Sequence, residues 1–287
     1  MSASVYECHG HALMDGAAYA DARRRHADGV DLDAVHRCLA ALRDAGVTYF
    51  RDGGDALGVS LRARELAGEY GIVYRSPAFA IHKQGRYGGI VGRGWGDLRE
   101  YRALVAEAKA EGCDFIKLMF SGIITFREYG GLSCPGLTAE EIAALVEIAH
   151  GEGFAVMAHV NGAETVKAAI EAGTDSIEHG YFMDDACLDA LARSDAIWVP
   201  TVAAIEAFVD RPGFDPAVAR RTLETQLACI RAAADRGARI AAGSDSGAVG
   251  VPHGAGTKTE YRLLRAAGLT DAQIETANRA LAERFQR

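Results

Sequence analysis

Short apolar runs alternate along the chain with longer segments whose apolar positions recur every three or four residues. The short runs are rich in β-branched and aromatic side chains, as is typical of buried strands. They predict eight strands, at residues 5–11, 47–50, 72–75, 114–119, 154–159, 174–178, 197–200 and 239–242. The longer segments predict helices at about 31–45, 59–70, 97–111, 138–151, 162–172, 184–193 and 215–237, with two more after the last strand.

The alternation of strand and helix predicts a parallel sheet, because parallel neighbours need a crossover connection. Eight such units in 287 residues favour the α/β class and a (β/α)8 TIM-like barrel that forms one domain over residues 1–287. An open doubly wound sheet is the main alternative, but no Gly-X-Gly-X-X-Gly turn follows a predicted strand. Glycine-rich loops at 85–96, 121–136 and 244–257 follow strands, on the side where barrel enzymes build active sites.

Side chains that can bind metals fall at the carboxyl ends of the predicted strands. His9 and His11 end the first strand, where residues two apart point to the same side. Four more residues follow on later strands: Lys117 in the fourth, His159 at the end of the fifth, His179 after the sixth and Asp245 after the eighth. In a barrel, all six converge on one mouth.

Taken singly, most of these residues also have ordinary explanations. Asp245 lies among Ser and Gly as in a turn, and His179 precedes Gly180 as at the start of a helix. Lys117 is different, since Ile, Leu, Met and Phe surround it in what should be a buried strand. An unpaired ammonium is costly there. Lys117 therefore needs a partner or a chemical modification.

Composition limits the classes of partner. The chain has 39 acidic and 31 basic residues and a formal charge of −8, which argues against nucleic acids and anionic membranes and favours a small-molecule partner. We find no N-terminal leader and no apolar run long enough to span a membrane, so we expect a cytoplasmic protein. The six cysteines form no Cys-X-X-Cys pair, and a disulfide framework is not expected. The sequence does not indicate an oligomeric state.

The ordered set of His9-X-His11, Lys117, His159, His179 and Asp245 on five strands resembles the amidohydrolase superfamily. The resemblance extends from about residue 5 to about residue 285. Smaller features are similar to the imidazolonepropionase-like and prolidase-like branch: Arg51-Asp52-Gly53-Gly54, Phe115-Ile116-Lys117, Pro252-His253-Gly254 and the last helix after Gly268-Leu269-Thr270. Members of that branch usually carry a small β-sandwich, for which we expect no segments here.

The resemblance implies a centre of two divalent metal ions. Lys117 would react with carbon dioxide to form N6-carboxylysine, an anion that bridges both ions. By the same resemblance, His9, His11, carboxylated Lys117 and Asp245 would hold one ion, and the carbamate with His159 and His179 would hold the other. Imidazole and oxygen ligands suit zinc, with manganese, cobalt or iron as alternatives.

The resemblance also implies roles in hydrolysis. Asp245 would be the general base toward a water molecule that the two metals activate. His82, after the third strand, is a candidate donor to the developing oxyanion, and His253 has similar status. Arg127 and Tyr129, in the glycine-rich loop after the fourth strand, are candidates for binding a substrate carboxylate. Each of these four residues can equally be an ordinary loop residue.

These inferences lead to a functional expectation. The chain is expected to be a binuclear metal-dependent hydrolase that cleaves an amide-type bond in an N-acyl amino acid, a dipeptide or a cyclic amide. A mononuclear deaminase, or an ester or carbamate hydrolase on the same barrel, is the alternative among enzymes. The alternative outside enzymes is a metal-bound scaffold that binds small molecules. Lys117 argues against a mononuclear deaminase, which does not need a lysine on the fourth strand.

Overall fold

The computed structural model describes residues 4–286, and within them ten strands form two parallel sheets. The smaller sheet contains β1 (Val5–Gly10), β2 (Val47–Asp52) and β3 (Val73–Arg75). The larger sheet runs in the order β10 (Arg239–Ile240), β9 (Ile197–Val199), β8 (Ser176–His179), β7 (Val156–Val160), β6 (Ile116–Met119), β4 (Ala80–Lys83) and β5 (Gly92–Trp95). Every pair of neighbouring strands in the two sheets is parallel, as the alternation predicts.

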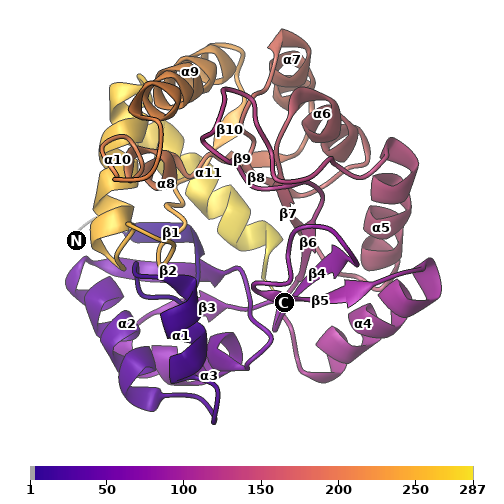
Figure 1. Cartoon of the computed structure of the whole chain (residues 1–287), viewed down its shortest axis with the longest axis vertical. Coiled ribbons are helices and arrows are strands. Elements are labelled where there is room, and N and C mark those ends of the chain that lie inside the picture. The colour runs from indigo at the N-terminus through magenta and orange to yellow at the C-terminus, as the bar shows by residue number, and fades with distance from the viewer. Residues whose placement is uncertain (1–3, 287) are drawn as a thin grey trace.

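Helices form a layer around these strands (Figure 1). They are α1 (Tyr19–Arg25), α2 (Leu32–Asp44), α3 (Val59–Ala67), α4 (Leu98–Ala110), α5 (Ala139–Gly151), α6 (Ala163–Glu171), α7 (Asp185–Arg193), α8 (Val202–Glu206), α9 (Pro216–Asp235), α10 (Ala255–Ala266) and α11 (Asp271–Arg284). Side-chain caps begin several of them; Thr138 and Glu141, for example, form a capping box at α5. None of the described helices has both the length and the apolar composition needed to cross a bilayer.

Backbone hydrogen bonds join the two sheets beside β1. The amide of Cys8 donates to the carbonyl of Ala242 at 2.8 Å, and the amide of His11 donates to that of Ser246 at 2.7 Å. On the other side, the third strand position is divided between the sheets, since β3 pairs with β2 whereas β4 pairs with β6. The fold is therefore a TIM-like barrel of the α/β class, and all eight predicted strands are present.

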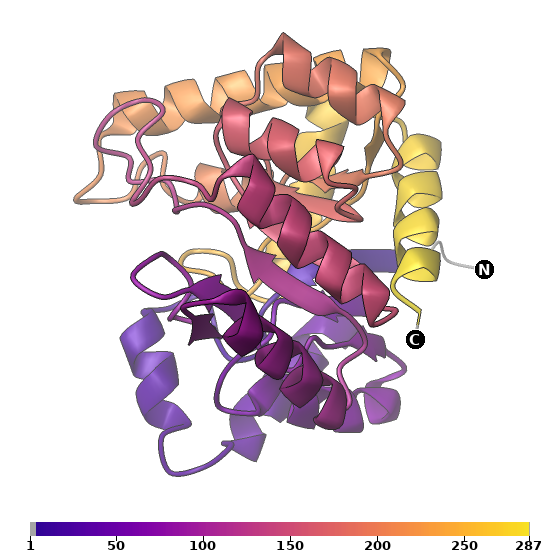
Figure 2. The same cartoon turned by 90° about the vertical axis from the view of Figure 1, so that its right-hand side faces the viewer.

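The end of the barrel opposite the long loops is closed by α11. Phe285 packs edge-on against Phe115, with ring centroids 5.2 Å apart, and the guanidinium of Arg51 lies 4.3 Å from the centroid of the Phe285 ring. Figure 2 shows α11 at one end of the molecule and the long loops that follow β6 and α8 at the opposite end. The loop end is thus the end of the barrel that α11 does not cover.

Four short elements were not predicted from the sequence. These are α1, α8, β4 and β5. The segment Gly92–Trp95 is rich in glycine and lacks alternating apolar residues. The sequence therefore predicts a loop at 85–96, where the structure has the strand β5. His82 consequently lies within β4 and not in a loop after the third strand.

Candidate metal centre

All six predicted metal-binding residues line one cavity of about 250 Å³ at the carboxyl ends of the strands. They come from β1, β6, β7, β8 and the segments after β1 and β10. The residues are His9, His11, Lys117, His159, His179 and Asp245. Side chains that are far apart in sequence thus face the same space, as the barrel interpretation predicts.

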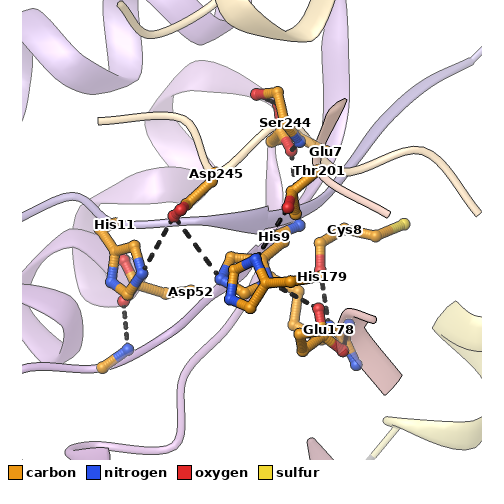
Figure 3. A network of polar contacts seen from close by, with 12 residues as sticks. Glu7, Cys8, His9, His11, Asp52, Glu178, His179, Thr201, Ser244 and Asp245 are labelled. Atoms are coloured by element: carbon orange, nitrogen blue, oxygen red, sulfur yellow. Dashed lines mark hydrogen bonds and ion pairs between the residues drawn. The ribbon is translucent and has the colours of Figure 1, made fainter. Parts of the chain in front are cut away.

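Asp245 lies between the rings of His9 and His11 (Figure 3). One of its carboxylate oxygens, Oδ1, is 3.6 Å from Nε2 of His9 and 3.4 Å from Nε2 of His11. One ligand atom from each of the three residues falls within 4.8 Å of the others, a spacing that suits a single metal ion. The backbone explains this proximity, because the amide of Asp245 donates to the carbonyl of His9 at 2.9 Å.

His159 and His179 lie on the neighbouring strands β7 and β8. Their ring centroids are 4.5 Å apart, and the ring of His179 is 4.9 Å from that of His9. His179 has a φ of 66°, in the left-handed region, and Asp245 has a φ of 60°. For residues other than glycine this conformation is strained, and such strain gathers at functional sites. At the end of β8 it turns the ring of His179 toward the cavity.

Burial keeps the imidazoles of His9, His159 and His179 neutral. It is the largest cause that lowers the pKa of His9 to about 4 and that of His159 to about 3, and it also lowers the pKa of His179. The positive charge of Lys117 acts in the same direction on His9 and His159. Neutral imidazole is the form that coordinates metal ions.

Lys117 is buried in β6, with 1% of its surface exposed. Its Nζ atom has no hydrogen-bond partner in the described part of the chain. Burial lowers the pKa of this amine to about 8, although the charge of Glu178 opposes that shift. Nδ1 of His11 and Oδ1 of Asp245 are likewise buried without a hydrogen-bond partner among the described residues. Three unpartnered polar atoms around one cavity fit a site that is completed by metal ions and a modified lysine.

Glu178 is a residue of the site that sequence reasoning missed. Its Oε2 accepts a hydrogen bond from Nδ1 of His9 at 2.5 Å, while its Oε1 accepts one from Nη2 of Arg51 at 2.8 Å. Burial acts to raise the pKa of Glu178, but the charge of Arg51 and the hydrogen bond from His9 lower it to about 2. The Glu178 carboxylate fixes the His9 ring so that Nε2 faces the cavity. The available signal was an acidic residue inside an apolar parallel strand.

The structure does not bring His82 or His253 into the lining of the cavity within residues 4–286. Nδ1 of His82 lies 3.0 Å from the carbonyl of Lys83, and the ring packs beside Gly88 and Gly94. Nε2 of His253 lies 3.1 Å from the carbonyl oxygen of His11, so His253 supports the backbone of a predicted ligand.

Arg127 and Tyr129 also lie outside the described lining of this cavity. Arg127 is exposed. Tyr129 packs edge-on against Phe182 at 5.3 Å, and the guanidinium of Arg221 lies 3.9 Å from the centroid of its ring. Tyr129 therefore packs against Phe182 and Arg221, which are not part of the described cavity lining.

Tyr87 lines the cavity but was not singled out from the sequence. Its ring centroid is 5.0 Å from that of His159, and its hydroxyl has no hydrogen-bond partner among the residues that the structure describes. Burial raises the pKa of this hydroxyl, so it keeps its proton and can donate a hydrogen bond. Tyr87 lies in the predicted loop 85–96, where nothing in the local sequence distinguishes it.

Comparison with known sequences places this site in a family. The model of the amidohydrolase family matches residues 32–280. An uncharacterised protein of Mycobacterium tuberculosis is 29% identical over 180 residues, which are 61% of this chain and 47% of that protein. Ochratoxinase of Aspergillus niger is 27% identical over 200 residues, which are 65% of this chain and 38% of that enzyme. The chain thus spans about half or less of the curated relatives it matches.

Solved structures show the same fold. A Xaa-Pro dipeptidase with bound methionine aligns over 98% of this chain and 75% of its own, with a TM-score of 0.78 and 24% identity. The crystal structure of A. niger ochratoxinase aligns over 96% of this chain and 69% of its own, with a TM-score of 0.76 and 21% identity. With a family model that matches most of the chain and a barrel that carries the expected residues in one cavity, the protein belongs to the amidohydrolase family.

Proposed function

We propose that this protein is a hydrolase that uses two divalent metal ions, with zinc as the first candidate, to cleave amide-type bonds in small molecules. One observation carries the proposal: six potential ligands from separate strand ends line a single cavity, and three of their polar atoms are buried without partners in the described chain. Membership of the amidohydrolase family supports it. So does the likeness to a dipeptidase and to ochratoxinase, which sets the fold.

The residues present fit the proposed metal centre. His9, His11 and Asp245 would hold one ion, His159 and His179 the other, and Lys117 would bridge the two as N6-carboxylysine. The ammonium of Lys117 first gives up one proton; the neutral amine then joins the carbon of carbon dioxide, and a second proton is released. It converts a buried cation without a hydrogen-bond partner into an anion that metal ions stabilise. When bound, such ions lower the pKa of a water molecule and polarise a carbonyl oxygen.

Asp245 supplies the acid–base chemistry in this proposal. Its carboxylate would accept a proton from water as the water oxygen attacks the carbonyl carbon, and would return a proton to the leaving nitrogen. Burial alone would raise the pKa of Asp245, but its interactions with His11 and with the neighbouring His9 and His179 lower it. The carboxylate is thus ionised before reaction, as a general base must be.

Tyr87 replaces His82 as our candidate donor to the carbonyl oxygen of the substrate. Tyr87 lines the cavity and its hydroxyl lacks a hydrogen-bond partner among the described residues, whereas His82 is not part of the described lining. A hydrogen bond that strengthens as charge develops on the oxygen contributes directly to catalysis. Removing one such donor costs about 10²–10³ in kcat in well-studied hydrolases.

A mononuclear enzyme, such as a deaminase, is the second candidate. It is favoured by one observation, the spacing of His9, His11 and Asp245 within 4.8 Å, which describes a single ion. Against it stands the buried amine of Lys117, which a centre with one metal leaves without a role.

Metal content and turnover test the proposal together. Protein purified without chelators is expected to contain about two equivalents of divalent metal per chain and to release amines from simple amides. One equivalent with full activity would favour the mononuclear alternative. Two equivalents without hydrolysis of any amide, ester or carbamate would overturn the assignment as a hydrolase.

A further inference from the structure

Beyond its predicted metal ligands, the cavity is almost wholly apolar. Apart from tyrosines, the residues that line it without being predicted ligands comprise thirteen hydrophobic residues and Asn161. Those hydrophobic residues are Met14, Ile90, Val91, Met119, Ile123, Ile124, Phe126, Ala204, Ile205, Phe208, Phe214, Ala248 and Val249. They come from five different segments that follow strands, so the apolar character does not depend on one loop.

The few other polar groups are already engaged. Asn161 accepts a hydrogen bond from the amide of Tyr181 at 3.1 Å and donates one to the carbonyl of Gly122 at 3.1 Å. The hydroxyl of Tyr181 lies 2.8 Å from Oγ1 of Thr201, and that of Tyr19 donates to the carbonyl of Ile90. In the described chain, Tyr87 alone keeps a hydroxyl free for a ligand in this cavity.

Three phenylalanines form one wall of the cavity. Phe126 comes from the loop after β6, and Phe208 and Phe214 come from the segment between α8 and α9. Phe126 stacks on Phe208 with centroids 4.8 Å apart, and Phe214 meets Phe208 edge-on at 4.7 Å. This aromatic wall, Phe126, Phe208 and Phe214, offers ring faces and edges to a planar apolar group.

No arginine lines the cavity as far as the structure describes it, and its one lysine is Lys117. A substrate carboxylate that lies among the apolar lining, out of reach of the proposed metal ions, would therefore have no cationic side chain as a partner. Burying an unpaired charge is strongly unfavourable. The lining thus selects against the N-acyl amino acids and dipeptides that a carboxylate-binding arginine would favour.

We propose that the substrate is an uncharged amide with an apolar, preferably aromatic, group against the wall of Phe126, Phe208 and Phe214. This inference rests on the proposed function and deepens it. In the reaction, water adds across the amide: the C–N bond breaks, a C–O bond forms, and the products are an apolar carboxylic acid and an uncharged or protonated amine.

Two matched compounds test the charge preference. N-phenethylbenzamide and N-benzoylphenylalanine share the scissile amide and both rings, and they differ only in the carboxylate. With metal-loaded protein, kcat/KM is expected to be at least about tenfold higher for the uncharged compound, because the other must bury an unpaired charge. Equal or higher kcat/KM for N-benzoylphenylalanine would overturn the inference.

Calorimetric binding of the same two compounds separates this inference from the proposed function. If neither is cleaved but N-phenethylbenzamide binds at least about tenfold more tightly, the hydrolase assignment fails and the charge preference stands. If neither compound binds, or if the carboxylate binds better, the charge preference itself is wrong.

Substitutions in the cavity lining test where the apolar group binds. Phe208→Ala is expected to raise KM for N-phenethylbenzamide about fivefold or more with little change in kcat, because binding contacts are lost without touching the reacting atoms. Ile123→Ala should act in the same direction, and since Ile123 is 43% exposed, its removal does not threaten folding. Leu98→Ala, on the exposed face of α4, is the control and should leave KM unchanged. Unchanged KM in both lining variants would contradict the proposed subsite.

Discussion

Lys117 and Glu178 are both ionisable residues inside apolar strands, yet only one of them has partners. Glu178 is held by Arg51 and His9, whereas Nζ of Lys117 has no hydrogen-bond partner in the described structure. An unsatisfied amine at this depth costs free energy that folding does not recover from local contacts. The difference indicates that Lys117 is retained for chemistry that involves a further group.

We expect Lys117→Ala to lose metal and hydrolytic activity together, because the bridging carboxylate would be gone. Metal analysis and an amide hydrolysis assay measure the two losses. Acetate or propionate should partly restore both, since a free carboxylate can fill the space of the missing one. Lys83→Ala, which removes a lysine that pairs with Glu141, is the matched control. Full metal content and activity in Lys117→Ala would refute the bridging role.

Asp245→Asn should preserve the fold and lose about 10²–10⁴ in kcat, because the amide keeps the shape of the side chain but cannot accept the proton. Steady-state kinetics and thermal unfolding of the same sample measure both properties. Near-normal turnover with a full complement of metal would mean that another group is the base.

The sequence was sufficient to predict the six cavity residues but not their supporting contacts. A ligand at the carboxyl end of a strand is visible as a polar residue that ends an apolar run, and His159 and Asp245 are of this kind. The roles of Tyr87 and His82 depend on which way a glycine-rich loop folds. The backbone of such a loop can adopt many conformations. Its sequence has no regular pattern of apolar residues from which the direction of a side chain could be predicted. The sequence therefore singled out His82 and not Tyr87, the residue of this region that lines the cavity.

At the scale of elements, Glu178 connects three strands. From β8 it reaches His9 on β1 and Arg51 on β2, while Oγ of Ser176 donates to its Oε1 at 2.6 Å. These contacts cross between the two sheets. The same residue therefore fixes a predicted ligand and holds the barrel interior together.

Glu178→Gln should lower the free energy of unfolding by about 3 kcal/mol, because Arg51 is left as a buried charge without its carboxylate. It should also weaken metal binding about 10–100-fold, since His9 loses the group that orients it. Chemical denaturation and metal titration measure these effects. Glu171→Gln, which breaks an exposed pair with Lys167, is the control and should cost less than about 0.5 kcal/mol. Equal stabilities of the two variants would show that the Arg51–Glu178 pair is not structural.

Glu260 gives a dependence of stability on pH. Its Oε2 accepts a hydrogen bond from the amide of Ala203 at the start of α8, and its Oε1 has no partner among the described residues. Burial raises the pKa of Glu260 from its ordinary value of 4.5 to about 8. Between these pH values the folded chain holds a proton that the unfolded chain has released, so stability falls as pH rises, by up to about 1.4 kcal/mol per pH unit.

The variant Glu260→Gln removes this titration. Its stability relative to the wild type should therefore increase as pH rises from about 5 to 8, with no further increase above 8. Thermal unfolding of both proteins at intervals of one pH unit measures the difference. A difference in melting temperature that does not change with pH would show that Glu260 is ionised in the folded protein.

At the scale of the whole molecule, the periodicity of the sequence predicted the eight strands and the helices between them, because parallel strands and amphipathic helices both leave regular apolar patterns. The interruption of the third strand position was not visible. Pro77 and Ala78, which has a φ of 64°, separate β3 from β4, and this break depends on packing against β2 and β6. The outer strand β5 pairs with β4, so its place in the sheet also depends on this break.

Metal should stabilise the entire barrel, because the proposed ligands come from both sheets. Removing it with a chelator should lower the melting temperature by roughly 5–10 °C, the effect expected for ions present at about 100 times their dissociation constant. Added zinc should restore it, and calorimetry measures both steps. His150→Ala, which removes a histidine far from the centre that pairs with Asp175, should show the same shift. A melting temperature indifferent to chelator and zinc would argue that no metal binds the folded chain.

The hydrogen bonds that join β1 to residues 242–246 have a consequence for synthesis of the chain. His9 is synthesised well before its partner Asp245, because most strands of the barrel lie between them in the sequence. Until then, β1 keeps an open edge and the first histidines lack the carboxylate that faces them. If these residues hold a metal ion as we propose, its capture between His9, His11 and Asp245 follows translation of the strands that lie between them.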